Sequence, residues 1–449
     1  MPSRHPTPSA KKCSLRPDVS VVKLYEGTSL TRSEWSSQLG VSVSTVEYLI
    51  NARILRPGNG DRLELAFVGI VVFNDSLLFA APKFVGGKSF DLPEILRILR
   101  DYFARSAFRR PVVDRMHDPE YGNSEALREY DALQRMQEWF FTHGLYRREQ
   151  AQVSDLGRPH WVKTIAKCSP ILIQGAVIYP HIIAERREGI LNDVSALQIS
   201  ILRRLLERYG MATPSVVEHS EKATGSIVSQ WPIPDNQRTY LDRRLALEQR
   251  SVFRTDSLQL LRLLRELLGS RLAEVTSQPQ IYGTTAFYSV WEDACRVAIG
   301  TESQIDPVSS LGQPVWWSQN NMREKTRYDQ EQIPDIVVVR RGWNVIIDAK
   351  YYYRFPASRP GGPDIVKQLY YMEALRTPGA NVLSVFLVPF PGEERPKFLG
   401  YSTIEGAHRP FPKIEAWGID PGQLFANYPA ASAHGADDLI AFILSQRGS

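Results

Sequence analysis

The stretch IPDIVVVRRGWNVIIDAKYYY (Ile333–Tyr353) holds two runs of β-branched and other apolar residues, separated by a short turn around Gly342. Runs of this kind on either side of a glycine turn are typical of a β-hairpin. Asp335 opens the first run, and Asp348 lies near the end of the second, thirteen positions later. Antiparallel pairing across the turn therefore brings the two carboxylates onto neighbouring positions. Lys350, two residues after Asp348, points to the same face of its strand.

This arrangement of two acids and one lysine predicts a site for a divalent metal ion. Two hard oxygen ligands close together suit Mg²⁺, with Mn²⁺ as a substitute, and water and a substrate phosphate complete the octahedron. An ammonium beside the ion can orient a water or help to deprotonate it. Such a site suits attack of hydroxide on a phosphodiester. The alternative is a hairpin with surface charges, but both acids are embedded in apolar strands, where an unpaired charge is costly.

The segments around this hairpin predict an α/β module. A helix is expected in AFYSVWEDACRVAIG (Ala286–Gly300) before it and in PDIVKQLYYMEALRT (Pro363–Thr377) after it, followed by a strand in NVLSVFLVPF (Asn381–Phe390). The order helix, strand, strand, helix, strand is typical of α/β domains. We therefore expect one domain over residues 256–449.

The whole chain of 449 residues is long enough for two or three domains, and its 43% apolar and 23% charged residues are globular values. We expect a flexible tail over 1–18, an N-terminal module over 19–108 and a mostly helical middle region over 109–255. The longest apolar runs are far shorter than the roughly 20 residues of a membrane span. The basic N-terminus has no apolar core of a secretory signal, and three scattered cysteines indicate no disulfide framework. These features predict a cytoplasmic protein without membrane contact.

The N-terminal module contains a predicted pair of short helices over Ser29–Leu55, which meet at Gly40, and a predicted hairpin with its turn at Asn74–Asp75. The helix pair resembles a helix-turn-helix, whose second helix enters the major groove of DNA. Its expected reading face carries no Arg or Lys, so docking on another protein is the alternative.

Pro334-Asp335 followed by Asp348-Ala349-Lys350 resembles the PD-(D/E)xK nuclease motif. In that superfamily, a glutamate on the preceding helix commonly completes the metal site. Glu292 has that place in the order of elements, and Asp293 is the alternative. The resemblance implies that Asp335, Asp348 and Glu292 bind the metal ion and that Lys350 is catalytic.

The superfamily often carries a Gln and a Tyr on the helix after the DxK strand, and KQLYYMEA supplies Gln368 with Tyr370 and Tyr371. The resemblance implies that Gln368 joins the catalytic group. Basic and aromatic side chains around these strands are suited to gripping phosphates and stacking on bases. We expect DNA contacts from Lys367, Arg354, Tyr371 and Tyr370, although a solvated surface has a similar composition.

A second resemblance covers residues from about 60 to 405. GRPHWVKTI (Gly157–Ile165), AVIYP (Ala176–Pro180), YSVWEDACRVAIG and IIDAKYY are similar to the LlaJI-type restriction endonuclease family, which is related to McrC. LLFAAPKF (Leu77–Phe84) is similar to a segment near the start of McrC-like proteins. Members are nuclease subunits that work with an AAA+ GTPase of the McrB type. The sequence contains no Walker A string GxxxxGK[ST], which agrees with a motor on a separate chain.

Together these features predict an α+β multidomain protein. Its C-terminal domain would be an α/β PD-(D/E)xK restriction-endonuclease-like domain, with a central mixed sheet flanked by helices. The resemblances imply a Mg²⁺-dependent endonuclease subunit of an anti-phage restriction system, acting on double-stranded DNA with a McrB-like AAA+ GTPase, and dimerisation through the nuclease domain. A stand-alone endonuclease and a catalytically degenerate DNA-binding adaptor are the alternatives.

Overall fold

The structure is a computed structural model in which part of the chain is described. The described residues are 20–73, 76–84, 90–106, 120–121, 125–147, 149–153, 158–187, 193–209, 211, 216, 233–269, 279–299, 305, 311, 316–317, 323–324, 334–352, 355–406, 410–426, 428 and 435–447. The predicted tail over 1–18 lies outside them. Among the helices in these ranges, none combines the length and the apolar character needed to cross a membrane.

The chain divides into two units, each built from segments that are far apart in sequence. Unit 1 consists of residues 1–22, 72–77 and 124–280, and unit 2 of residues 23–71, 78–123 and 281–449. Unit 2 therefore combines most of the predicted N-terminal module with residues 281–449 of the predicted nuclease domain. Residues 256–280 lie in unit 1 instead.

Helices dominate unit 1. Neighbouring helices pack together: α4 (Glu125–His143), α6 (Asp193–Arg208), α8 (Asp235–Ser251) and α9 (Thr255–Gly269). The apolar side chains of α6, among them Leu197, Ile201 and Leu205, are buried. Two hydrogen bonds connect buried polar groups inside the bundle: Gln198 accepts from the Tyr146 backbone N–H at 2.7 Å, and the Tyr146 hydroxyl donates to Glu248 at 2.8 Å.

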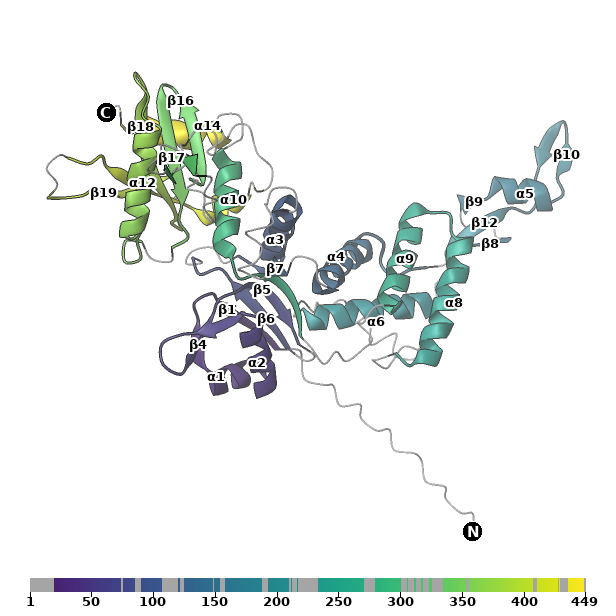
Figure 1. Cartoon of the computed structure of the whole chain (residues 1–449). Helices are drawn as coiled ribbons and strands as arrows, with labels where there is room; N and C mark the ends of the chain where they lie inside the picture. Colours follow the sequence, from purple (N-terminus) through teal and green to yellow (C-terminus); the bar gives the residue numbers. More distant parts are fainter. Residues whose placement is uncertain are drawn as a thin grey trace, which may run out of the picture. The chain divides into compact units, whose positions relative to one another are not determined.

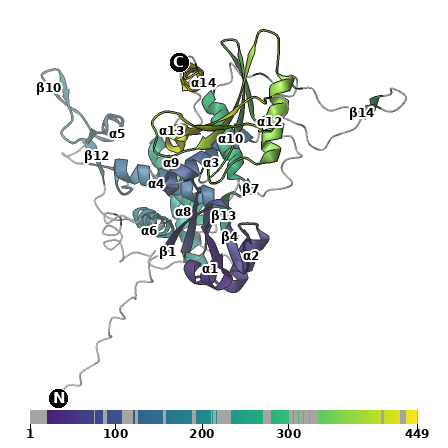
Figure 2. The same cartoon turned by 90° about the vertical axis from the view of Figure 1, so that its left-hand side faces the viewer.

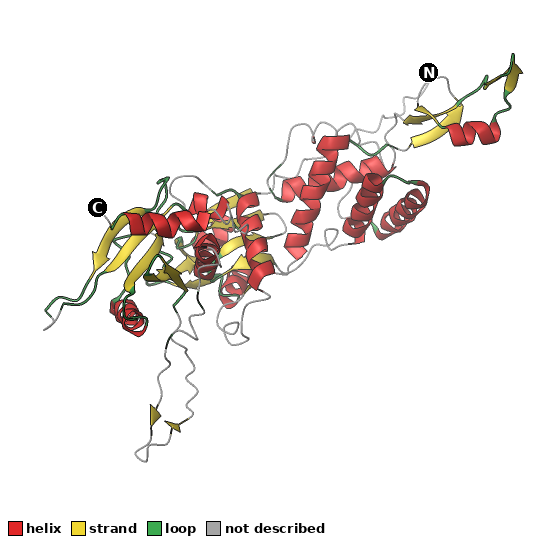
Figure 3. Ribbon diagram, turned by 90° about the horizontal axis from the view of Figure 1, so that it is seen from above, coloured by secondary structure: helices red, strands yellow, loops and turns green. Residues whose placement is uncertain are grey.

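A small β element also belongs to unit 1, and Figure 3 shows its strands in yellow beside one red helix. β8 (Glu149–Val153), β12 (Ile183–Arg187) and β9 (Arg158–Pro159) form an antiparallel sheet in that order. Between β9 and β12 the chain forms α5 (Trp161–Lys167) and the hairpin of β10 (Ile171–Ile173) and β11 (Ala176–Ile178). Every residue of β10 and β11 is exposed.

A five-stranded sheet, which we call the N-terminal sheet, takes four strands from the first 121 residues and a fifth, β13, from residues 280–284. Its order is β1 (Ser20–Tyr25), β6 (Ser76–Ala81), β5 (Val68–Val72), β13 (Gln280–Thr284) and β7 (Glu120–Tyr121). The predicted hairpin is confirmed, because β5 and β6 are neighbours and both are buried throughout. Its turn residues Asn74 and Asp75 lie outside the described part. The helix α3 (Leu92–Ser106) follows, and the Asp91 side chain accepts from the Glu94 backbone N–H at 2.9 Å at its start.

The predicted pair of short helices is also confirmed. α1 (Arg32–Leu39) ends at Gly40, which has a left-handed backbone with φ of 64°, and α2 (Val43–Asn51) begins after the cap Ser42. A three-stranded antiparallel sheet flanks the pair, in the order β2 (Ser29–Thr31), β4 (Arg62–Leu65), β3 (Leu55–Pro57). Trp35 ties the two parts together, because its indole N–H donates to the Leu63 carbonyl at 3.0 Å.

The C-terminal part of unit 2 is built on a mixed five-stranded sheet (Figures 1 and 2). Its order is β16 (Ile336–Arg340), β17 (Trp343–Ala349), β18 (Asn381–Pro389), β20 (Ile414–Ile419) and β19 (Lys397–Ser402). The inner pairs β17–β18 and β18–β20 are parallel, and the outer pairs β16–β17 and β19–β20 are antiparallel. The short strands β14 (Trp316–Trp317) and β15 (Arg323–Glu324) pair with each other.

Helices flank this sheet. α12 (Gly362–Ala374) packs on the face that carries Ile346 and Phe386, where Tyr371, Met372 and Leu375 complete an apolar core. The helix α10 (Phe287–Ile299) also contacts β17, and α13 (Pro421–Ala426) and α14 (Gly435–Ser445) pack on α10. The expected α+β protein with a mixed C-terminal sheet is therefore confirmed.

The hairpin predicted around Gly342 forms with a regular register. Arg341 and Gly342 have φ of 48° and 76°, the left-handed pair that a two-residue type I′ turn requires. The register then pairs Arg340 with Trp343 and continues to Ile336 with Ile347. The turn therefore fixes which residues meet at the far end of the hairpin.

Candidate active site

Asp335 and Asp348 lie opposite each other at the far end of the β16–β17 hairpin. The last regular pair is Ile336 with Ile347, so the next residue on each side is an aspartate. Asp335 turns back onto the partner strand, because its Oδ2 accepts from the Ala349 backbone N–H at 2.8 Å. Asp348 is only 5% exposed. Both carboxylates are therefore held at one end of the hairpin.

The electrostatics show that these carboxylates face each other. Burial, the charge of Glu292 and the charge of Asp348 raise the pKa of Asp335 well above its ordinary range, and the hydrogen bond from Ala349 only partly opposes this shift. Like charges at close range favour the protonated form of an acid. The two carboxylates therefore lie on neighbouring positions, as antiparallel pairing across the turn predicts.

Glu292, on α10, is close enough to the acid pair for its charge to raise the pKa of Asp335. The next turn of this helix touches the same place, because the Arg296 guanidinium donates to the Asp335 backbone carbonyl at 3.2 Å. Asp293, the alternative third acid, has a different environment. It accepts from the Tyr428 hydroxyl at 2.8 Å and from Arg105 at 3.2 Å. Of these two adjacent acids, Glu292 is the one whose charge acts on Asp335.

Lys350 lies between two carboxylates. Its Nζ is 3.2 Å from Oδ2 of Asp348 and 2.9 Å from Oδ1 of Asp364. Asp364 stands in the first turn of α12, where its other oxygen accepts from the Gly361 backbone N–H at 3.2 Å. Burial alone lowers the pKa of Lys350, but the charges of Asp348 and Asp364 outweigh it and raise the pKa. The side chain is therefore an ammonium aimed at the acid pair.

Gln368 connects α12 to the acid pair. It is 0% exposed, and its side-chain N–H donates to Oδ2 of Asp348 at 3.1 Å. Its carbonyl oxygen accepts from the hydroxyl of Ser384 on β18 at 2.7 Å. Because the Asp348 carboxylate can only accept hydrogen bonds, the nitrogen end of the amide must face Asp348, and the oxygen end is left for the Ser384 hydroxyl. Asp348 thus sets the orientation of Gln368, and Ser384 satisfies the buried amide oxygen.

The residues expected to contact DNA have different surroundings. Tyr370 is partly exposed on α12, and the Nζ of Lys367 lies 5.7 Å from the ring centre of Tyr371. Tyr371 is 0% exposed, and its buried hydroxyl has no hydrogen-bond partner. The charges of Asp348 and Asp335 contribute, after burial, to raising the pKa of Tyr371, so this hydroxyl lies near the acid pair. Arg354 lies outside the described residues.

The donor set suits a hard divalent cation. Across the described ranges, no group of three or more His, Cys, Asp or Glu side chains is arranged to hold a metal ion. The pair Asp335 and Asp348 supplies two oxygens, which is the number that Mg²⁺ commonly takes from protein carboxylates while it keeps waters and substrate phosphate. The two carboxylates repel each other, and a bound cation would relieve this repulsion and lower the energy of the pair.

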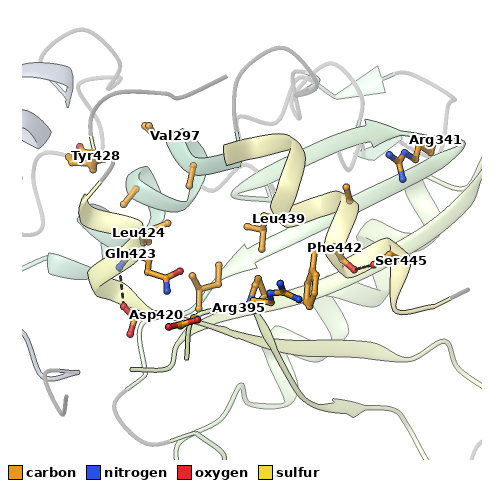
Figure 4. A pocket seen from close by; sticks show the side chains of 16 residues that line it. Val297, Arg341, Arg395, Asp420, Gln423, Leu424, Tyr428, Leu439, Phe442 and Ser445 are labelled. Atoms are coloured by element: carbon orange, nitrogen blue, oxygen red, sulfur yellow. Dashed lines mark hydrogen bonds between the residues drawn. The ribbon is translucent and has the colours of Figure 1, made fainter. Parts of the chain in front are cut away.

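A cavity of about 720 Å³ lies elsewhere in unit 2 (Figure 4). Leu424 of α13, Phe442 of α14 and Val297 of α10 line it, with Arg395 and Asp420 also in its wall. None of the residues predicted to bind metal or DNA lines this cavity. Its size is that of a small-molecule site, but the predicted metal-binding and catalytic residues lie elsewhere.

Two residues of the site were missed by the sequence reasoning. Ser384 is a lone polar residue inside the apolar run VLSVFLV, and such an interruption in a buried strand is a usable signal. Asp364 follows Gly361-Gly362-Pro363 at the expected start of a helix, a pattern that predicts a cap rather than a partner for a lysine.

The chain is similar in sequence to a family of restriction endonucleases and to one component of a restriction enzyme. Residues 67–403 match the family described as LlaJI restriction endonuclease. The type II restriction enzyme BsuMI component YdjA of Bacillus subtilis (strain 168) is 21% identical over 330 residues, which cover 67% of this chain and 66% of that protein. The chain therefore spans slightly less than two thirds of that relative.

Two solved structures from Thermococcus gammatolerans also match. One is a half-complex of McrB AAA+ hexamers with bound McrC, with a TM-score of 0.36 and 13% identity, covering 94% of this chain and 100% of that one. The other is the McrBC complex, with a TM-score of 0.23 and 11% identity, covering 61% and 85%.

Proposed function

This chain belongs to the LlaJI restriction endonuclease family, and we propose that it is the nuclease subunit of a restriction system that hydrolyses phosphodiester bonds of double-stranded DNA with Mg²⁺. The observation that carries this proposal is the close pair of Asp335 and the buried Asp348, with the Lys350 ammonium 3.2 Å from Asp348. In this proposal, the C-terminal sheet with its flanking helices is a PD-(D/E)xK nuclease domain.

Each residue has a separate task in this reaction. Asp335 and Asp348 would hold the ion, and bound Mg²⁺ stabilises the charge that develops on the phosphate oxygens. Lys350 keeps its proton and donates hydrogen bonds, which orient the attacking water toward phosphorus. Glu292 is an added ligand or orients a water from the side of α10.

Gln368 acts on Asp348 rather than on the substrate. Its amide donates to one carboxylate oxygen, which leaves the other oxygen for the ion. Groups that orient a metal ligand in this way commonly change metal affinity or activity by about 10- to 100-fold when they are removed. Lys367, Tyr370 and Arg354 remain proposed DNA contacts, whereas the ring and the hydroxyl of Tyr371 are both buried and offer no surface for DNA.

We also propose a protein partner, an AAA+ GTPase of the McrB type. A surface on unit 1 supports a protein contact. The exposed apolar side chains of α5 and of the β10–β11 hairpin are Trp161, Val162, Ile165, Ile171, Leu172, Ile173, Val177 and Ile178. Apolar surface of this extent usually marks contact with a protein or a membrane, and ILIQGAVI carries no charge that would bind a phosphate.

The test is to purify this chain with the product of the neighbouring gene and to measure cleavage of supercoiled plasmid with Mg²⁺, with and without nucleotide. The proposal expects nucleotide-stimulated cutting that Asp348→Ala abolishes. Cutting by the chain alone would favour a stand-alone endonuclease. No cutting under any of these conditions, with DNA binding retained, would identify a degenerate adaptor and contradict the nuclease proposal.

A further inference from the structure

Tyr351 directly follows Lys350 and lies two residues beyond the end of β17. It is 8% exposed and is surrounded by rings and a cation. Its ring centre lies 5.4 Å from that of Phe84 and 5.6 Å from that of Phe287, and the Nζ of Lys83 lies 4.3 Å from it. Phe287 is on α10, whereas Phe84 and Lys83 follow β6 of the N-terminal sheet. Tyr351 therefore connects the strand of the proposed nuclease site to the N-terminal module.

Both hydrogen-bonding functions of the Tyr351 hydroxyl are used. It donates to Oε2 of Glu26 at 2.6 Å and accepts from the Lys83 backbone N–H at 3.2 Å. Burial and the neighbouring Glu26 charge raise the pKa of Tyr351, so the hydroxyl keeps the proton that it donates. Glu26 itself is fixed, because its backbone N–H donates to the Ala81 carbonyl at 2.8 Å, next to the end of β6.

Lys350 lies just beyond the end of β17, where the regular hydrogen bonds of the strand stop. The last residue of β17 is Ala349, and the Lys350 backbone N–H makes one more bond, to the Leu387 carbonyl at 2.8 Å. The Lys350 side chain is held by Asp348 and Asp364, and Asp348 is itself a proposed metal ligand. The side chain of Tyr351 is therefore the anchor that fixes the backbone just beyond the lysine.

We propose that Glu26 and Lys83 form a clamp on Tyr351 that positions Lys350 for phosphodiester hydrolysis. This inference rests on the proposed function, and it assigns to the N-terminal module a part in the nuclease site. Tyr351, Glu26 and Lys83 are positioning residues, since they act through Lys350 and touch no substrate. A displacement of β1 or β6 would move Tyr351 and with it the ammonium.

The test compares two buried tyrosine–carboxylate bonds in the full-length protein. Tyr351→Phe removes only the hydroxyl of the clamp, and Glu26→Gln removes only its charge. Tyr428→Phe is the matched control, because Tyr428 is also buried and its hydroxyl donates to Asp293 at 2.8 Å. Both tyrosine substitutions break one bond of the same kind, but only Tyr351 is next to Lys350.

Hydrogen exchange measures the clamp without any need for activity. In the metal-free protein, we expect Tyr351→Phe and Glu26→Gln to speed exchange in the peptide that covers residues 349–352, and Tyr428→Phe to leave that peptide unchanged. This result supports the clamp even if wild-type protein cuts no DNA, an outcome that would contradict the proposed function alone. Unchanged exchange in both clamp variants would overturn the clamp.

Single-turnover cleavage then tests the action on Lys350. We expect Tyr351→Phe to lower the maximal rate by about tenfold with little change in the DNA concentration needed for half-maximal rate. In a Lys350→Gln background, the same substitution should have no further effect, because the group that it positions is gone. A rate loss that is equal in the two backgrounds, or equal to that of Tyr428→Phe, would show a merely structural role and overturn the inference.

Discussion

Glu292 and Asp293 are neighbours on α10, yet their carboxylates act in opposite surroundings. Asp293 is buried and balanced, with Arg105 at 3.2 Å, the Tyr428 hydroxyl at 2.8 Å and Arg296 at 3.8 Å. Glu292 lies where two further acids meet, and its charge raises the pKa of Asp335. One helix therefore contributes to a neutralised acid cluster and to a repulsive one.

The difference separates a structural role from a functional one. Asp293, which is paired with Arg105 and the Tyr428 hydroxyl, links α3, α10 and the segment after α13. Because its charge is already balanced, it needs no bound cation. An acid pair with a single lysine lacks positive charge and gains energy when a divalent cation binds. We derive four predictions about DNA cleavage and stability from the difference between the Asp293 cluster and the Asp335–Asp348 pair.

Loss of a metal ligand should have the largest effect. Asp348→Ala is expected to reduce DNA cleavage by about 1000-fold or more, because metal stabilisation of the reacting phosphate amounts to several kcal/mol. Thermal unfolding should show little loss of stability, since the change also relieves repulsion. Single-turnover cleavage and a melting curve measure both effects. Retained Mg²⁺-dependent cleavage in a clean preparation would remove Asp348 from the site.

Loss of the residue behind Gln368 should have a smaller effect on the same reaction. Ser384→Ala leaves the buried Gln368 amide oxygen without its donor and so loosens the amide that holds Asp348, and a change in such a supporting residue commonly costs about 10- to 100-fold in metal affinity or activity. A titration of the cleavage rate with Mg²⁺ measures the shift. The control is Ser195→Ala, a buried serine on α6, which should not move the titration. Equal curves for the two variants would exclude the proposed orienting bond.

A substitution at Asp293, in the balanced cluster, should lower the stability of the protein and leave DNA cleavage unchanged. Asp293→Asn leaves Arg105 without its charged partner and is expected to lower the free energy of unfolding by about 2 kcal/mol. The cleavage rate of the folded protein should stay near that of wild type. Chemical denaturation and single-turnover cleavage give the two values. A loss of cleavage as large as that of Asp348→Ala would place Asp293 in the active site.

The smallest effect concerns stability without metal. The raised pKa of Asp335 means that its ionisation opposes folding, so wild-type stability should fall as the pH rises from the ordinary Asp range to the raised value. Asp335→Asn keeps an oxygen for Ala349 and removes this cost. We expect the variant to be more stable by on the order of 1 kcal/mol at neutral pH, with the gain vanishing in acid.

Melting curves across pH, with and without Mg²⁺, measure this gain. Added Mg²⁺ should stabilise wild type and not Asp335→Asn, because binding to the folded state alone shifts its apparent stability. A variant that is less stable than wild type at neutral pH would show that the two carboxylates do not repel each other.

Much of the acid pair follows from the sequence because the information is local. A glycine turn of two residues fixes the register, and the register determines that Asp335 faces Asp348. The helices around Glu292 and Gln368 were likewise predictable from their apolar faces and their place in the order of elements. Their exact contacts with the acids needed the structure.

The rest depends on pairings between distant parts of the chain. Tyr351 meets Glu26 across 325 positions, and neither residue belongs to a pattern that marks the other. Ser384 meets Gln368 because β18 lies parallel to β17, which places Ser384 beside Ile346. The division into units is similar in kind, because unit 2 joins residues 23–71 with 281–449. Local periodicity contains no record of such contacts.

Crystals of the full-length protein soaked with Mn²⁺ would examine the acid pair without any assay of activity. The account predicts an anomalous peak in contact with an oxygen of Asp335 and an oxygen of Asp348, at roughly 2.0–2.3 Å from each, and no such peak in Asp348→Ala crystals. Well-ordered Asp335 and Asp348 with no ion between them at saturating Mn²⁺ would contradict it.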